Sequence, residues 1–230
     1  MSGLRLASKL QIGGKHTINT DTVGGDHVKK EIVWPHGHQA AAMICIMLDA
    51  EFIWLGMDPE KYDTPKHRSM GEYGPRRGIN RILEALDRFQ VKATFFAPGI
   101  FAETYPEQLK EIAEAGHEIA LHGYRHEDFG GLSKEQQQSV LNRGAKAIEQ
   151  TIGRMPVGFR LPEGGCTEET LTLIQQAGFL YDNSFFDHDI PYRIPGSGAY
   201  ADMIEIPTRW ELIDFPYLAW GDSFPAGNAR

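Results

Sequence analysis

The sequence predicts an α/β protein built on a parallel sheet or barrel. Short apolar segments of strand character alternate with segments of helical spacing from about residue 42 to residue 206. Most connections between them are short, and alternation of this kind gives right-handed crossovers between parallel strands. The 230 residues, 41% of them hydrophobic, suffice for one sizeable core and are too few for two comfortable domains. We therefore expect one domain.

The first 33 residues differ in composition from the rest of the chain. They are polar and rich in glycine, with little apolar periodicity, which is typical of an arm or a subunit-contact segment. We place the folded domain at residues 34–230, beginning at Trp34-Pro35. Its first strand is expected at residues 42–48, Ala-Met-Ile-Cys-Ile-Met-Leu. Because this run is apolar on both faces, we expect a strand that is buried on both sides of the sheet.

The later elements follow from apolar spacing and capping signals. Ser133 with Gln136 forms a capping box, Thr167 is typical of a helix N-cap, and Gly116 and Gly178 are typical of helix ends. The expected helices span residues 75–89, 106–115, 133–152 and 167–177, and the expected later strands span 91–97, 117–121, 157–160, 179–182 and 203–206. About six strands are fewer than a closed eight-stranded barrel requires. Two long irregular stretches, 51–74 and 185–202, follow strands, and we expect them to hold the substrate.

The composition argues against several classes of protein. A formal net charge of -8 without any Lys/Arg block argues against a nucleic-acid partner. The chain has no run of about 18 uninterrupted apolar residues and no apolar segment near its N-terminus, which argues against membrane spanning and secretion. Cys45 and Cys166 lie far apart, in or beside apolar runs, so we expect reduced thiols. These observations predict a cytoplasmic enzyme that acts on a small molecule.

Three residues form a candidate metal site. His122 and His126 are four residues apart directly after an expected strand, so one helical turn would direct both imidazoles to one point. Asp49 directly follows the first strand, and its carboxylate is expected at the same edge of the sheet. Two imidazoles and a carboxylate match the ligand pattern of catalytic Zn²⁺. Two histidines hydrogen-bonded in a loop, and an aspartate that caps a loop, are the alternatives.

Several short motifs resemble those of a known family. In chain order they are Trp34-Pro35-His36-Gly37-His38, Asp49-Ala50-Glu51, Ala93-Thr94-Phe95-Phe96, Ala115-Gly116-His117-Glu118, His122-Gly-Tyr-Arg-His126 and Phe159-Arg160-Leu161-Pro162. Their order and spacing resemble the NodB-type polysaccharide-deacetylase family over about residues 34 to 215. The entry motif and the segments 181–184 and 189–192 are similar to the branch that contains allantoinase-like enzymes, cyclic imidases and some peptidoglycan deacetylases. The resemblance implies a distorted (β/α) barrel, which we expect to be incomplete at its C-terminal end.

The resemblance also implies a metal-dependent hydrolase of carbon–nitrogen bonds other than peptide bonds. The ligands carried over are Asp49, His122 and His126, and Arg160 would orient an acidic group. One divalent ion is implied, with Zn²⁺ favoured, while Fe, Co, Ni and Mn fit the same ligands and a metal-free member of the branch stays an alternative. Two departures stand out: Met47 occupies the position of the family's general base, so that Glu51 is the candidate substitute, and no histidine after His188 supplies the late general acid.

The substrate is expected in a closed pocket beside this site. The residues proposed to line it are Trp54, Glu163, Phe185, Asp189 and Tyr192. A small cyclic imide or ureide is the favoured substrate, because of the branch resemblance. The alternatives are an N-acetyl carbohydrate such as peptidoglycan or chitin, which would place the protein in carbohydrate metabolism, and a non-catalytic subunit with a degenerate site. An open barrel edge further predicts a homo-oligomer, or a second chain that completes the barrel.

Overall fold

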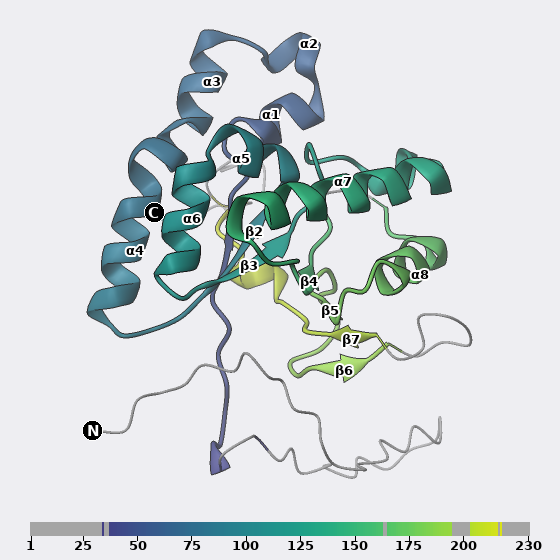
Figure 1. Ribbon diagram of the computed structural model, residues 1–230. Helices are drawn as coiled ribbons and strands as arrows, with labels where there is room; N and C mark the ends of the chain where they lie inside the picture. Colours follow the sequence, from purple (N-terminus) through teal and green to yellow (C-terminus); the bar gives the residue numbers. More distant parts are fainter. Residues whose placement is uncertain (1–33, 35–36, 163–164, 195–202, 216, 218–230) are drawn as a thin grey trace. The chain divides into compact units, whose positions relative to one another are not determined.

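A computed structural model describes residues 34, 37–162, 165–194, 203–215 and 217 (Figure 1). The chain divides into two units, residues 1–41 and 42–230. The helices and strands named below all belong to the second unit. Because the predicted arm at residues 1–33 lies outside the described residues, the predicted domain boundary at residue 34 stays a prediction.

The second unit is built on a mostly parallel sheet. Its strands are β1 (Cys45–Met47), β2 (Thr94–Ala97), β3 (Glu118–Leu121), β4 (Gly158–Phe159), β5 (Tyr181–Asp182), β6 (Tyr192–Arg193) and β7 (Ile204–Glu205). They are ordered β1-β2-β3-β4-β5-β7-β6, and each neighbouring pair is parallel except the antiparallel β6–β7. The predicted α/β class with a parallel sheet is therefore confirmed. The described strands form an open series, and β6 was not expected from the sequence.

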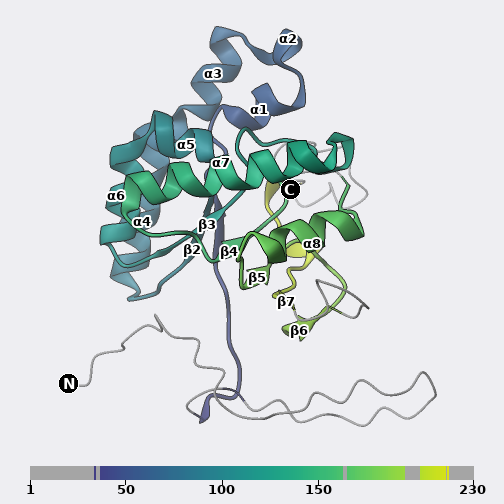
Figure 2. The same cartoon turned by 45° about the vertical axis from the view of Figure 1, so that its right-hand side comes forward.

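The described chain also contains α-helices and shorter helical turns. They are α1 (Phe52–Met57), α2 (Pro59–Tyr62), α3 (Pro65–Gly71), α4 (Ile79–Arg88), α5 (Gly99–Thr104), α6 (Pro106–Glu114), α7 (Lys134–Ile152) and α8 (Glu168–Gln176), with a π-helical turn at Gly74–Gly78 and 3₁₀ turns at Phe129–Gly131 and Trp210–Leu212. The capping box of α7 forms as predicted, and Thr167, the predicted N-cap of α8, forms a capping box with Thr170. Figures 1 and 2 show α1, α2 and α3 grouped at one end of this unit.

The stretch 51–74 is not irregular, contrary to expectation. It contains three short helices, and α2 and α3 each begin with a proline directly after a capping residue. The Asp58 carboxylate accepts a hydrogen bond from the Lys61 N–H, and the Thr64 hydroxyl accepts one from the His67 N–H. Proline at the first helical position and Asp or Thr as N-cap are standard helix starts. The same residues are frequent in loops, which explains the error.

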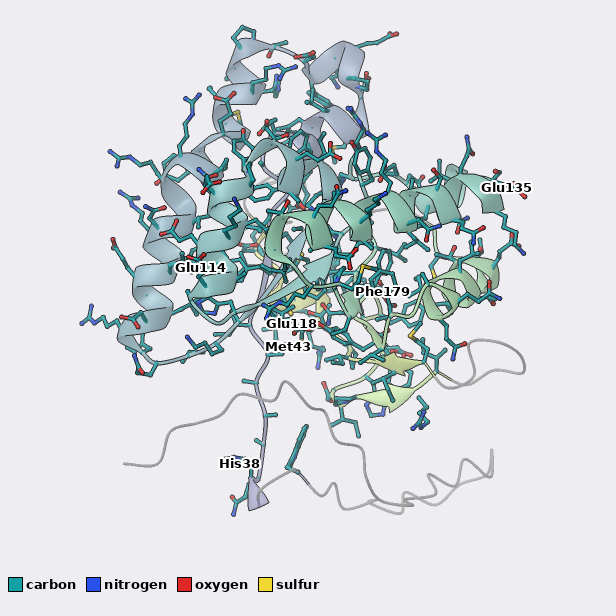
Figure 3. All side chains as sticks on the ribbon, in the orientation of Figure 1. His38, Met43, Glu114, Glu118, Glu135 and Phe179 are labelled. Atoms are coloured by element: carbon teal, nitrogen blue, oxygen red, sulfur yellow. The ribbon has the colours of Figure 1, made fainter. Side chains whose placement is uncertain are left out.

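The first strand is also less buried than predicted. Residues 45–47 are half-buried, and Met43 and Ile44, which precede them, are 38% and 41% exposed. The reason is the place of β1 in the described sheet, where it pairs with β2 and stands at the end of the strand order. Figure 3 labels Met43, just before β1, and Glu118, the first residue of β3, so that both mark the amino end of their strands. An edge strand has only one neighbour to cover it.

The core lies between the sheet and the helices that cover it. Phe95, Phe96, Phe159 and Ile174 are completely buried, and α8 contributes Ile174 to the same core as the central strands. Because β1, β3, β4 and β5 are parallel, their carboxyl ends all lie on the same side of the sheet. Polar residues that directly follow these strands are therefore brought together. Among the described helices, none has both the length and the apolar character needed to cross a membrane.

Candidate metal centre

Three potential ligands converge at the carboxyl ends of β1 and β3. Asp49 follows β1 by two residues, His122 directly follows Leu121 of β3, and His126 lies four residues farther on. Their potential ligand atoms all lie within 4.8 Å of one another. The two histidines are 2% and 4% exposed, and the Asp49 carboxylate is partly accessible. The structure thus brings together the three residues that the sequence singles out.

The loop between the two histidines has a defined conformation. His126 has a left-handed backbone with φ 66°, and Gly123 has φ 69°. The Glu127 carboxylate accepts hydrogen bonds from the N–H groups of Tyr124 and Arg125, both at 2.9 Å. Helix α1 packs on this loop at Gly56, where an added Cβ would lie 2.7 Å from the carbonyl oxygen of His126. The Glu127 hydrogen bonds and the packing of α1 therefore both hold this loop in place.

Hydrogen bonding fixes the orientation of the His122 ring. Its Nδ1–H donates to the carbonyl oxygen of Arg160 at 2.9 Å. The Nε2 atom then carries the lone pair and faces Asp49 Oδ1 at 3.4 Å, while His126 Nε2 lies 3.8 Å from Asp49 Oδ2. Burial, and then the neighbouring His126, hold the pKa of His122 well below its usual value, and burial lowers the pKa of His126 to about 4. Both imidazoles are therefore neutral at neutral pH.

This arrangement fits a divalent metal ion. Ligand atoms that each lie about 2.0–2.1 Å from one ion in a tetrahedral site are roughly 3.3–3.4 Å apart. The two nitrogen–oxygen distances of 3.4 and 3.8 Å are close to that separation and longer than a good hydrogen bond. Two neutral imidazoles and a carboxylate are a donor set of catalytic metal sites, and the Nε2 lone pair of His122 is available for an ion. A carbonyl that accepts the other ring N–H is the usual support for such a histidine.

Arg160 lies beside this centre and is held by Asn183. Its guanidinium is nearly buried, and Nη1 donates to the carbonyl oxygen of Asn183 at 3.1 Å and to Asn183 Oδ1 at 2.7 Å. The Cys45 thiol also donates a hydrogen bond to Asn183 Oδ1, at 3.6 Å. Asn183 was missed in the sequence, although it follows β5 as directly as His122 follows β3. That position after a strand was the signal that could have identified it.

Glu51, the candidate general base, does not join the three ligands. Its carboxylate accepts the hydroxyl hydrogen of Tyr105, with oxygen–oxygen distances of 2.9 and 3.0 Å, and is 5% exposed. The other charged groups that act on Tyr105 are Glu72 and Arg76. Among the described His, Cys, Asp and Glu residues, the ligand cluster consists of Asp49, His122 and His126. The structure therefore gives the Glu51 carboxylate a hydrogen-bond partner between α5 and α6, and its role as general base stays a prediction.

The predicted substrate-binding residues are spread over three segments. Trp54 on α1 is half-buried and packs against Tyr62 and His67, with ring centroids 5.9 Å apart in both pairs. Phe185 and Tyr192 are half-buried, and the Tyr192 hydroxyl donates to Asp187 at 2.7 Å. Asp189 is exposed and forms an ion pair with Arg209 at 2.7 Å. Glu163 lies outside the described residues, and the common pocket stays a prediction.

Comparison with known proteins identifies the family. The sequence profile described as "Polysaccharide deacetylase" matches residues 71–181. A peptidoglycan deacetylase-like protein of Gibberella zeae is 36% identical over 165 residues, 71% of this chain and 49% of that protein. A peptidoglycan deacetylase of Helicobacter pylori is 32% identical over 191 residues, 74% of this chain and 65% of that protein. The chain belongs to the polysaccharide deacetylase family.

Solved structures of other proteins are similar to this fold. A putative polysaccharide deacetylase from Mycobacterium smegmatis superposes with a TM-score of 0.74 and 39% identity, covering 80% of this chain and 64% of that chain. A structure of Puue allantoinase gives a TM-score of 0.61 and 28% identity, over 67% and 51% of the two chains. Polysaccharide deacetylases are metal-dependent hydrolases of carbon–nitrogen bonds other than peptide bonds. The chain spans about half to two thirds of the length of these relatives.

Proposed function

We propose that this protein is a metal-dependent deacetylase of N-acetyl carbohydrates. The observation that carries the proposal is the geometry of Asp49, His122 and His126, whose ligand atoms lie within 4.8 Å of one another beside Arg160. Of two relatives that align over most of this chain, one is named a peptidoglycan deacetylase and the other a peptidoglycan deacetylase-like protein, which favours an acetamido sugar as the substrate. The cyclic imide or ureide expected from the sequence has weaker support, from the allantoinase structure.

The residues of the centre would divide the chemistry among them. Asp49, His122 and His126 would hold a divalent ion, of which Zn²⁺ is our choice because of the imidazole-rich ligand set. When bound, such an ion polarises an amide carbonyl and lowers the pKa of a water molecule. The carbonyl of Arg160 keeps His122 in the tautomer that binds. The buried Arg160 guanidinium places a positive charge at the edge of the sheet where the amide oxygen would gain negative charge.

A second candidate is a subunit that binds the metal without catalysis. It is favoured by the position of Met47, which ends β1 and lines an apolar cavity of about 80 Å³ with Ile79, Ile82 and Phe101. Methionine cannot accept a proton, and Glu51, the candidate substitute, is bound to Tyr105. The described residues thus add no further carboxylate to the metal centre. A deacetylase assay distinguishes this candidate from the first.

The test combines metal analysis with two substrate classes. We expect about one divalent metal per chain, lost in His122→Ala and retained in the control His188→Ala, whose imidazole is exposed. The purified protein should release acetate from N-acetylglucosamine oligomers and leave succinimide and allantoin intact. Ring opening without acetate release would restore the cyclic-imide reading. Bound metal without either reaction would favour the non-catalytic subunit, and absence of metal under retaining conditions would overturn the metal centre.

A further inference from the structure

Two carboxyl groups lie side by side at the carboxyl end of the sheet. Asp182 ends β5 and Glu205 ends β7, and the two residues face each other in the parallel register of these strands. Both are completely buried. A buried carboxylate is costly, and two adjacent carboxylates repel each other. The pair therefore needs either a proton or a strong compensating charge.

The hydrogen bonds of the pair engage one carboxyl oxygen of each residue and leave the other oxygen without a described donor. Asp182 Oδ1 accepts from the Ser184 hydroxyl at 2.7 Å, and Glu205 Oε1 accepts from the Phe185 N–H at 3.0 Å. The remaining oxygens, Asp182 Oδ2 and Glu205 Oε2, are buried and receive no hydrogen bond from a described donor. Each carboxyl interacts with the other. A single proton on one of these oxygens would satisfy both, because the protonated group donates to its partner.

Arg160 is the nearby cation. Burial lowers the pKa of Arg160, and the charges of Cys45, Asp182, Asp49 and Glu205 act in the opposite direction. Its guanidinium is anchored on Asn183, the residue that follows Asp182. A buried guanidinium is stable only with an opposite charge near it. In the proposed metal centre the charge of Asp49 is engaged by the ion, which leaves the carboxyl pair as the available counter-charge.

We propose that Asp182 and Glu205 share one proton and that the single negative charge of the pair holds Arg160 in place. The two are positioning residues, because they act through Arg160, whose carbonyl oxygen orients His122. The proposal does not depend on the substrate.

Three other titratable residues, Cys166, Tyr192 and Asp187, interact electrostatically with the pair. Burial, followed by the charges of Asp182 and Glu205, raises the pKa of Cys166 to about 12, and burial raises that of Tyr192, so both stay neutral. Asp187 is exposed, and its negative charge favours the protonated form of Glu205. None of the three supplies a positive charge. Among these groups, the shared proton and Arg160 therefore compensate the negative charge of the buried pair.

Infrared spectroscopy tests the shared proton directly. At neutral pH the wild-type protein should show the carbonyl band of one buried protonated carboxyl group. Asp182→Asn and Glu205→Gln should each lose this band, since the remaining carboxyl then ionises beside Arg160. A wild-type spectrum without the band would overturn the proposal. A band that persists in both variants would belong to another residue and would overturn it equally.

Charge balance with Arg160 is tested by thermal unfolding. Each single variant keeps one negative charge, so neither should lower the Tm appreciably. The double variant Asp182→Asn/Glu205→Gln leaves Arg160 without its counter-charge and should lower the Tm by more than the sum of the single shifts. Adding Arg160→Met to the double variant should raise the Tm again, because the unpaired cation is then gone. Additive losses across all four variants, with no recovery in the triple variant, would show that the residues act only through packing.

Discussion

Gly56 is the residue at which helix α1 touches the metal-binding loop. A Cβ there would lie 2.7 Å from the carbonyl oxygen of His126 and 3.0 Å from that of Arg125. These are backbone atoms, so either α1 or the loop must move. We expect Gly56→Ala to lower the free energy of unfolding by about 1–3 kcal/mol. Because His126 shifts with the loop, we also expect Zn²⁺ affinity to fall roughly 10-fold, as for disturbed supports of metal ligands.

The control for this substitution is Gly74→Ala, since an added Cβ at Gly74 meets no atom within 4 Å. Its free energy of unfolding should stay unchanged or rise by up to about 1 kcal/mol, because Gly74 is in a helical turn and alanine favours a helix over glycine. Chemical denaturation and calorimetric Zn²⁺ titration measure both quantities. Equal Zn²⁺ affinity in the wild type and Gly56→Ala would show that α1 does not position His126.

Tyr105 is the hydrogen-bond partner of the buried Glu51 carboxylate. Tyr105→Phe removes that donor and leaves the carboxylate less satisfied, so the free energy of unfolding should fall by about 1.5–3 kcal/mol. Zn²⁺ affinity should stay unchanged, because Glu51 is outside the ligand cluster. Tyr192→Phe is the matched control: it breaks a similar bond, at 2.7 Å, to the exposed Asp187. Its effect should stay below about 1 kcal/mol. A metal-binding defect in Tyr105→Phe would return Glu51 to the centre.

The different outcomes for Asp49 and Glu51 show what sequence reasoning can reach at this scale. Asp49, His122 and His126 are found because each follows a strand closely, and parallel strands end at one edge. Glu51 is only two residues from Asp49, but α1 begins just after it, and its carboxylate meets a tyrosine 54 positions away in the chain. A contact of such sequence separation leaves no local signal. The role expected for Glu51 came from its closeness to Asp49 in the sequence and from the Asp-Ala-Glu pattern, and it stays a prediction.

At the scale of elements, the pairing of β5 with β7 predicts a pH dependence of stability. Burial, and then the charge of Asp182, raise the pKa of Glu205 from its usual 4.5 to about 10. Between these values the folded protein holds a proton that the unfolded chain has lost. The stabilising contribution is therefore complete below about pH 4.5 and declines as pH rises towards 10. For one proton the decline is at most about 1.4 kcal/mol per pH unit.

Glu205→Gln provides the comparison that isolates this contribution. The glutamine cannot titrate, and Asp182 then ionises beside Arg160. The variant should therefore lose less stability than the wild type between pH 6 and pH 9. The difference between the two losses should be on the order of the decline expected for one proton. Urea denaturation at several pH values measures the difference between the two curves. Parallel curves would mean that Glu205 does not keep its proton in the folded state.

The elements that sequence reasoning identified well are those with local signals. Helix α7 and helix α8 begin at capping boxes, whose two hydrogen bonds join residues three positions apart. The burial of β1 could not be derived from local signals. An apolar run shows that a strand tolerates burial, but not whether other elements pack on both of its sides. Strand β6 has two residues and depends on antiparallel pairing with β7. Such a short strand exists only because its partner is present.

At the scale of the whole molecule, the edge position of β1 supports the predicted association. Among the described strands β1 pairs only with β2, and Met43 and Ile44 beside it are 38% and 41% exposed. An apolar strand at the edge of a sheet favours pairing with a second chain. We therefore propose a homo-oligomer in solution and expect an apparent mass in gel filtration above the 25.8 kDa of one chain.

Ile44→Lys tests whether this edge forms the contact. A lysine at position 44 would bring its charge into an apolar contact formed along this edge, so the variant should elute at the mass of a single chain. Leu212→Lys is the control, because Leu212 is 82% exposed and lies in the 3₁₀ turn Trp210–Leu212, outside the sheet. It should associate as the wild type does. A wild-type mass of 25.8 kDa would contradict the oligomer, whereas an oligomer that survives Ile44→Lys would place the contact on another surface.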